Sequence, residues 1–144
     1  MQNISKILFT TLTIIFLTSC SQEINVKSID GYWEVNKVIR ADNSIVEYSS
    51  NNICDYYQLT SENKGFFKKV FTKIDGKVWV DDIQQEFEIT TQDGNTYLIM
   101  TSVADQRKLK IKKLTDKQLT IENEENITYF YNKTEPKNFL KNED

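Results

Sequence analysis

Short runs of alternating apolar and polar residues, separated by turn residues at intervals of about eight to twelve positions, constrain this chain more than any other feature. The alternation is clearest in residues 108–112, where Leu109 and Ile111 alternate with three lysines, and it recurs at Leu119 and Ile121. A period of two puts successive side chains on opposite faces of a strand, so one face is buried and the other is wet. Regularly spaced short strands of this kind are typical of an all-β barrel or sandwich.

Polar turns join these strands into consecutive hairpins. Asp93-Gly94 separates two strand-like runs, and a tight hairpin needs the positive φ that Gly accepts and Asp tolerates. Asp75-Gly76 supplies a second turn of this type. We therefore predict an antiparallel meander of eight strands, with Val78-Trp79-Val80 as a candidate ninth. The eight predicted strands are residues 31–40, 53–60, 65–73, 84–91, 95–102, 106–113, 117–123 and 127–133.

The predicted meander would leave two unpaired edges unless it closes on itself. An eight-stranded barrel is either filled by side chains or wide enough inside for one small ligand. We expect closure into an antiparallel, up-and-down barrel domain over residues 30–133. Residues 41–52, rich in Asn and Ser, form the longest predicted loop, and residues 134–144 form a polar C-terminal tail.

The N-terminus differs in composition from the predicted domain. Lys6 precedes eleven uncharged residues, 7–17, a stretch that is typical of a secretory signal and shorter than the roughly 20 residues of a spanning helix. The run Leu17-Thr18-Ser19-Cys20 resembles a bacterial lipobox. The resemblance implies that residues 1–19 are a cleaved signal peptide and that Cys20 carries a lipid anchor built from fatty acids such as palmitate. An ordinary secretory cleavage site is the alternative.

The residue after the lipobox bears on location. In the sorting rule of Gram-negative lipoproteins, Asp at this position retains a protein at the inner membrane, whereas this chain has Ser21. We therefore expect a lipid-anchored protein of the bacterial cell envelope, at the outer membrane, with the periplasmic or the surface face left open. Residues 20–29 would form the lipidated tether.

Composition narrows the function further. The chain has no His, the commonest general base and metal ligand. Loss of residues 1–19, which hold one Lys and no acid, changes the net charge from −3 to −4, and the absence of a basic stripe argues against a nucleic-acid partner. Only Cys54 remains after lipidation, and its apolar neighbours favour a buried strand cysteine over a reactive thiol. We expect neither an enzyme nor a bound cofactor.

The first predicted strand opens on Gly31-Tyr32-Trp33, which resembles the Gly-x-Trp signature of lipocalins. The chain as a whole is similar to bacterial lipocalin-like (calycin-type) lipoproteins over about residues 30–133. The resemblance implies a barrel whose open mouth receives a small hydrophobic molecule and whose closed end is crossed by Trp33. It also implies that a basic residue near the last strand stacks on this Trp, and Lys133 is the candidate. The Thr-Asp-Tyr type motif of lipocalins is absent from the chain.

Large side chains on the predicted strands are candidates for a cavity lining. These ligand-binding candidates are Trp33, Phe67, Phe71, Trp79, Phe87, Tyr97 and Tyr129. A pocket that they line would bind by apolar burial, at about 25 cal/mol per Å². The alternative interpretation is that the same side chains only fill the barrel.

A different class of function also fits the sequence. The barrel could act through its outer surface as a protein-interaction, stress or inhibitor module, with Lys108, Lys110, Lys112 and the loop 41–52 as the contact surface. Two acidic clusters lack the Asp/Asn-Gly spacing of a calcium loop, so we expect solvated acids and no metal site. These clusters are Asp81, Asp82, Glu86 and Glu88, and Glu122, Glu124 and Glu125.

Overall fold

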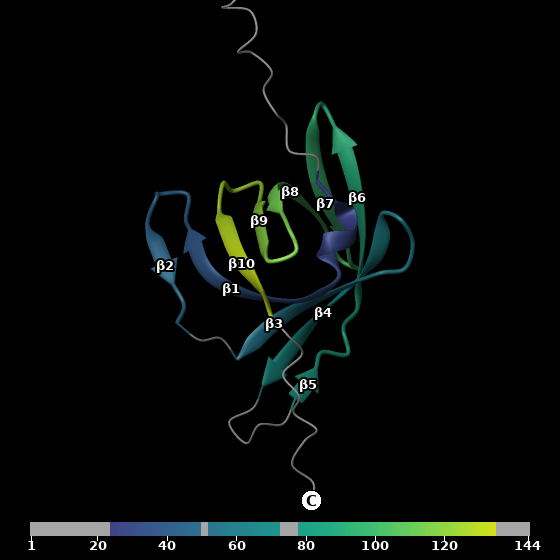
Figure 1. Ribbon diagram of the computed structural model, residues 1–144, viewed down its shortest axis with the longest axis horizontal. Helices are drawn as coiled ribbons and strands as arrows, with labels where there is room; N and C mark the ends of the chain where they lie inside the picture. Colours follow the sequence, from purple (N-terminus) through teal and green to yellow (C-terminus); the bar gives the residue numbers. More distant parts are fainter. Residues whose placement is uncertain (1–23, 50–51, 73–77, 135–144) are drawn as a thin grey trace, which may run out of the picture.

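The computed structural model describes residues 24–49, 52–72 and 78–134, and ten strands and one short 3-10 helix form within them. The strands are β1 (Gly31–Ile39), β2 (Ile45–Glu47), β3 (Ile53–Leu59), β4 (Lys64–Thr72), β5 (Val78–Val80), β6 (Gln85–Gln92), β7 (Asn95–Thr101), β8 (Gln106–Leu114), β9 (Gln118–Glu122) and β10 (Thr128–Thr134). The strand order is β10-β9-β8-β7-β6-β4-β3-β1, and β10 also pairs with β1. Eight antiparallel strands therefore close into a barrel, while β2 adds to β1 and β5 adds to β4 (Figure 1). The prediction of an all-β, antiparallel, up-and-down barrel is confirmed.

Local turn chemistry accounts for the meander. Between β6 and β7, Asp93 has φ 52° and Gly94 has φ 73°, as expected for a two-residue hairpin turn. Asn126 has φ 59° in the turn before β10. The predicted ninth strand is also present as β5, although the Asp75-Gly76 turn before it lies outside the described residues.

The predicted loop 41–52 contains a strand that sequence reasoning missed. Strand β2 pairs with the second half of β1, with Val46 opposite Val38. The hairpin between them closes through the Arg40 amide, which donates to the Ser44 carbonyl at 2.9 Å, and Asn43 takes a φ of 64°. Three residues are too few to show a period of two, so only this Asn-containing turn could have indicated the strand.

The predicted alternation gives the barrel its core. Leu109 and Ile111 of β8 are buried, and a register shift between Ile111 and Lys113 brings Leu114 inward again. The lysines between them face outward, where Lys112 Nζ lies 3.2 Å from Glu122 Oε1. The predicted solvated face of β8 is therefore present, and Cys54 is buried as expected.

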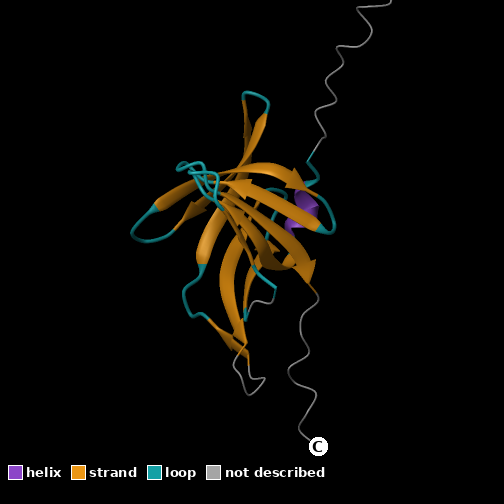
Figure 2. Cartoon of the chain, turned by 90° about the vertical axis from the view of Figure 1, so that its left-hand side faces the viewer, coloured by secondary structure: helices purple, strands orange, loops and turns teal. Residues whose placement is uncertain are grey.

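One end of the barrel is closed by helix η2 (Val26–Ile29), which lies within the segment assigned to the tether. Ile29 is fully buried, and its carbonyl accepts a 2.7 Å hydrogen bond from Trp33 Nε1. Ser28 Oγ donates to Asp116 Oδ1 at 2.7 Å. Figure 2 shows this short helix packed beside the curved strands. Ile29 supplies an apolar cover for Trp33, so residues 26–29 pack on the barrel.

Lys133 lies over Trp33 as the family resemblance implied. Lys133 Nζ is 5.2 Å from the centroid of the Trp33 ring and donates to the Ser28 carbonyl at 3.2 Å. These contacts join the last strand, the first strand and η2 at the closed end of the barrel.

At the opposite end, the β3–β4 hairpin leaves the barrel wall. Strand β1 pairs with β3 only from Gly31 to Trp33, and β6 pairs with β4 only as far as Phe67. Beyond these positions β3 and β4 pair with each other and β4 pairs with β5. We call this projecting part the flap, and it consists of Ile53–Cys54, Val70–Thr72 and β5. Figure 1 shows these strand ends extending away from the rest of the barrel.

The close approach of β4 to its neighbours generates a stability prediction. A Cβ on Gly65 would lie 2.0 Å from the Gln58 carbonyl oxygen and 2.7 Å from Phe87 Cζ, whereas a Cβ on Gly94 would meet no atom within 4 Å. Gly65→Ala should lower the free energy of unfolding by about 3 kcal/mol or more, because the added Cβ overlaps a backbone oxygen that can move only with its strand. Gly94→Ala is the matched control, with only the backbone cost of about 1–2 kcal/mol for a positive φ. Urea unfolding followed by circular dichroism measures both variants, and a Gly65→Ala loss no larger than the control would contradict this packing.

Candidate ligand site at the barrel mouth

The open end of the barrel contains a cavity of about 500 Å³, which we call the mouth cavity. Its floor consists of apolar and aromatic side chains from six strands. These floor residues are Tyr57, Phe67, Met100, Leu109, Ile121 and Tyr131. Small-molecule sites in proteins occupy roughly 300–1,000 Å³ and are lined mainly by such side chains. The volume and the floor therefore suit a small ligand.

The floor is rigid because its aromatic rings are packed against each other. Tyr57 is only 2% exposed, and its ring centroid lies 5.1 Å from that of Phe67 and 5.7 Å from that of Phe87. Below these rings, Trp33 and Leu119 are fully buried and fill the barrel. The barrel is thus solid in its depth and hollow at its mouth.

A charged pair stands in the wall of the mouth cavity, where the β3–β4 hairpin begins to leave the barrel. Asp55 and Lys69 are cross-strand partners, and Lys69 Nζ donates to Asp55 Oδ1 at 2.7 Å. The side chain of Asp55 is 12% exposed, whereas that of Lys69 is 45% exposed. Tyr131 donates a further hydrogen bond to Asp55 from β10. A buried carboxylate is stabilised by such partners, and these two satisfy Asp55.

Two tyrosines of the floor are held in the protonated state. Burial, together with the negative charge of Asp55, raises the pKa of the Tyr57 hydroxyl well above its ordinary value, and the Arg107 charge opposes this only in part. Burial also raises the pKa of Tyr131 well above its ordinary value, with Asp55 acting through its charge and its hydrogen bond. The floor of the mouth cavity therefore offers neutral hydroxyl groups beside the Asp55 carboxylate.

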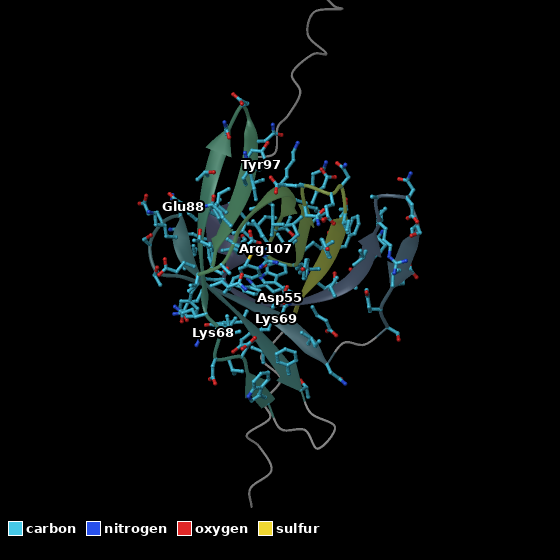
Figure 3. The ribbon with its side chains drawn as sticks, turned by 180° about the vertical axis from the view of Figure 1, so that it is seen from behind. Asp55, Lys68, Lys69, Glu88, Tyr97 and Arg107 are labelled. Atoms are coloured by element: carbon cyan, nitrogen blue, oxygen red, sulfur yellow. The ribbon has the colours of Figure 1, made fainter. Side chains whose placement is uncertain are left out.

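The rim of the mouth cavity is polar. Arg107 donates from its guanidinium to Gln85 Oε1 at 2.7 Å, and no ion pair of Arg107 occurs in the part of the chain that the structure describes. Figure 3 shows Arg107 close to Asp55 and Lys69, while Glu88 and Tyr97 lie farther out. The other polar rim residues are Asp105, Gln106, Lys108, Asn123, Glu124 and Glu125. Arg107 and Lys69 thus present cationic donors beside an apolar floor.

The seven candidate residues from the sequence lie in different parts of the molecule. Phe67 and Tyr129 line the mouth cavity, and Phe87 lies in the core behind Tyr57. Phe71 and Trp79 stack on the flap with ring centroids 5.0 Å apart. The two remaining candidates lie elsewhere: Trp33 is buried at the closed end, and Tyr97 is outside the barrel, with Lys108 Nζ 4.1 Å above its ring. The structure brings only part of the predicted set together.

Sequence reasoning missed the polar part of the site. Asp55 has the same strand phase as Tyr57, and Lys69 has the same phase as Phe67. A charged residue in the middle of an apolar face is the signal that could have identified both positions. Arg107 has the phase of Leu109 and Ile111, but it is the second residue of β8 and lies at the end of their apolar face, so the signal is weaker there.

The part of the chain that the structure describes contains neither a cluster of metal ligands nor a helix that could span a bilayer. No group of three or more His, Cys, Asp or Glu side chains there is placed to hold a metal ion. Within the same residues, no helix has the length and apolar character needed to cross a bilayer.

Two solved structures resemble this chain. One is a lipocalin-like protein from Bacteroides uniformis, with 16% identity, coverage of 74% of this chain and 99% of the other, and a TM-score of 0.47. The second is an uncharacterized protein from Bacteroides eggerthii, with 14% identity, coverage of 73% and 98%, and a TM-score of 0.48. No protein-family model and no curated protein matches the chain.

The raised pKa of Tyr131 predicts how the free energy of unfolding depends on pH. The unfolded chain ionises its tyrosines near pH 10, whereas the folded chain keeps Tyr57 and Tyr131 protonated to higher pH. Their contribution to stability is therefore full below about pH 10 and falls above it, by up to about 1.4 kcal/mol per pH unit for each tyrosine. Tyr131→Phe should cost about 1–2 kcal/mol at pH 7 through the lost hydrogen bond to Asp55, and this deficit should shrink above pH 10.

Urea unfolding at pH 7, 10 and 11 measures that deficit. Ile121→Val is the control, because it removes one buried methylene and should cost about 0.5–1.5 kcal/mol equally at each pH. A Tyr131→Phe deficit that stays constant with pH would contradict a protonated tyrosine at this position.

Proposed function

We propose that this protein is a lipid-anchored lipoprotein of the bacterial outer membrane whose barrel binds a small amphipathic molecule in the mouth cavity. The observation that carries the binding proposal is the mouth cavity itself, where an aromatic floor faces two cationic donors. The expectation of a small hydrophobic ligand becomes more specific here: the ligand has an apolar body and a polar, acceptor-rich group.

The apolar body of the ligand would rest on the floor rings. Tyr57 and Phe67 are locked by mutual packing, so little conformational entropy is lost when a ligand contacts them. Each Å² of apolar surface that the ligand removes from water contributes about 25 cal/mol.

The polar group of the ligand would lie at the rim. Arg107 retains donors beyond its bond to Gln85, and the Lys69 ammonium is partly exposed beside Asp55. A carboxylate, sulfonate or phosphate suits these donors, because hydrogen bonds between charged partners are stronger than neutral ones.

The position of η2 supports a mouth that points away from the membrane. Asp30, which follows η2, accepts a hydrogen bond from the Leu59 amide at one end of β3, whereas Ile53 at the other end of β3 belongs to the flap. Five peptide steps from Cys20 to Asn25 span at most about 18 Å, less than the roughly 23 Å length of the seven-residue β3. A lipid on Cys20 would therefore hold the closed end near the bilayer and leave the mouth open to the aqueous side.

A second candidate function, contact with a protein through the outer surface, is favoured by the flap rather than by the predicted lysine row. Trp79 and Val80 are 47% and 43% exposed, and Ile83 after them is 64% exposed. The lysines of β8 are instead engaged within the chain, for example Lys112 with Glu122.

The binding proposal predicts an effect of Arg107→Gln on an anionic aromatic probe. The soluble form that begins at Ser21 should bind 1-anilinonaphthalene-8-sulfonate with increased fluorescence. Arg107→Gln should weaken this binding about tenfold, because one charge-assisted hydrogen bond is lost. Lys110→Gln, on the outer face of the same strand, is the matched control and should leave affinity unchanged. Absence of binding, or equal effects of the two variants, would contradict a ligand site at the mouth.

The anchoring proposal predicts the effect of Cys20→Ser in cells. The wild-type chain should incorporate labelled palmitate and sediment with the outer membrane, whereas Cys20→Ser should lose the label and leave the membrane fraction. Cys54→Ser is the control, because its thiol is buried in β3 and should play no part in lipidation. Retention of the label by Cys20→Ser would rule out this anchor.

A further inference from the structure

A second hollow of about 280 Å³ opens beside the mouth cavity, and we call it the side hollow. Five of its lining residues do not line the mouth cavity: Trp33, Val35, Val38, Tyr48 and Ile53. From this second hollow we infer that the bound molecule is forked: it has two apolar arms joined at a polar group, with one arm in each hollow. The inference rests on the proposed function, since it concerns the ligand of the same site.

The two hollows share one partition. Asp55, Lys69, Tyr129 and Tyr131 line both of them. Asp55 and Lys69 come from β3 and β4, and the hydrogen bond from Tyr131 to Asp55 connects them to β10 on the far side of β1. This polar partition stands between the apolar floor of the mouth cavity and the side hollow, so a molecule that used both would have its polar part at the partition.

The origin of the side hollow lies in the register of β1. Its first residues pair with β3, but Lys37–Ile39 pair with β2, and a register shift falls between Val35 and Lys37. The wall therefore splits between β1 and β3, and Val35 and Val38 line the gap. Ile53 closes the gap from the flap and is 41% exposed.

The chemistry of the side hollow suits an apolar arm. Apart from the shared Asp55–Lys69 pair, its lining residues carry no charge. Tyr48 and Ile53 are both 41% exposed, so an arm in the side hollow would cover apolar surface that otherwise faces water. The mouth cavity, in contrast, has charged residues around its rim.

The junction of the two arms has to match the partition. Lys69 donates and Asp55 accepts at this place, and the Arg107 guanidinium lies on the mouth-cavity side. A phosphoryl or carboxylate-bearing junction with short chains fits these donors. The ligand class is thus a two-chain amphiphile with an anionic or zwitterionic polar group.

The test compares two probes that share a headgroup. Dihexanoylphosphatidylcholine has two short chains and hexylphosphocholine has one, and calorimetry below their micellar concentrations measures both affinities on the soluble form of the chain. The wild type should bind the two-chain probe at least tenfold more tightly. Val35→Phe, which fills the side hollow, should reduce the two-chain affinity about tenfold and leave the one-chain affinity unchanged.

A second variant and a control keep the result independent of folding. Ile53→Lys places a charge at the exposed edge of the side hollow and should act like Val35→Phe, whereas Ile83→Lys, at 64% exposure and outside both hollows, should change neither affinity. Thermal unfolding verifies that each variant is folded.

The possible outcomes separate the two proposals. If both side-hollow variants leave the preference for two chains intact, or if neither lipid binds while 1-anilinonaphthalene-8-sulfonate still does, the forked ligand is wrong and the mouth site stands. If none of the three probes binds, the proposed function fails and this inference fails with it.

Discussion

Seven residue pairs between β1 and β10 turn an open sheet into a barrel, and the remaining features depend on this closure. The ladder runs from Tyr32 opposite Thr134 to Ile39 opposite Thr128 and uses one side of β1 along its length. The other side of β1 is divided between β3 and β2. Because β3 leaves β1 after Trp33, the barrel is sealed at one end and split at the other.

Each end of the barrel has a lysine ammonium beside an aromatic ring, but only the lysine at the closed end is covered. At the closed end, the Lys133 ammonium lies over Trp33 and is covered by η2, so the contact serves packing. At the mouth, Lys69 Nζ lies 5.4 Å from the Phe67 ring centroid and pairs with Asp55, but no helix among the described elements covers it. A partly buried ion pair adds little to stability compared with an apolar pair of similar size. The mouth pair is therefore available for the ligand contact that we propose.

Residue type and strand phase predict only part of the candidate site. Phe67 and Tyr129 were predicted from size and phase, and both line the mouth cavity. Phe71 has the correct phase but lies past the point where β6 stops pairing with β4, so it faces the flap. Phase gives the side of a strand on which a residue lies, but it does not give the height along the barrel. Asp55 was missed because its role depends on Lys69 and Tyr131, which are distant in sequence.

The sequence by itself determined the strands, the hairpin turns and the inward and outward faces, because each follows from contacts within a few residues. The turn at Asp93-Gly94 and the alternation around Leu109 are examples, and both are present in the structure. Only the tertiary structure decided where the barrel is filled and where it is hollow. Filling depends on which strands pair with each other, on how many residues each pairing includes, and on helix η2 covering Trp33. These are contacts between residues distant in sequence, and no local pattern encodes them.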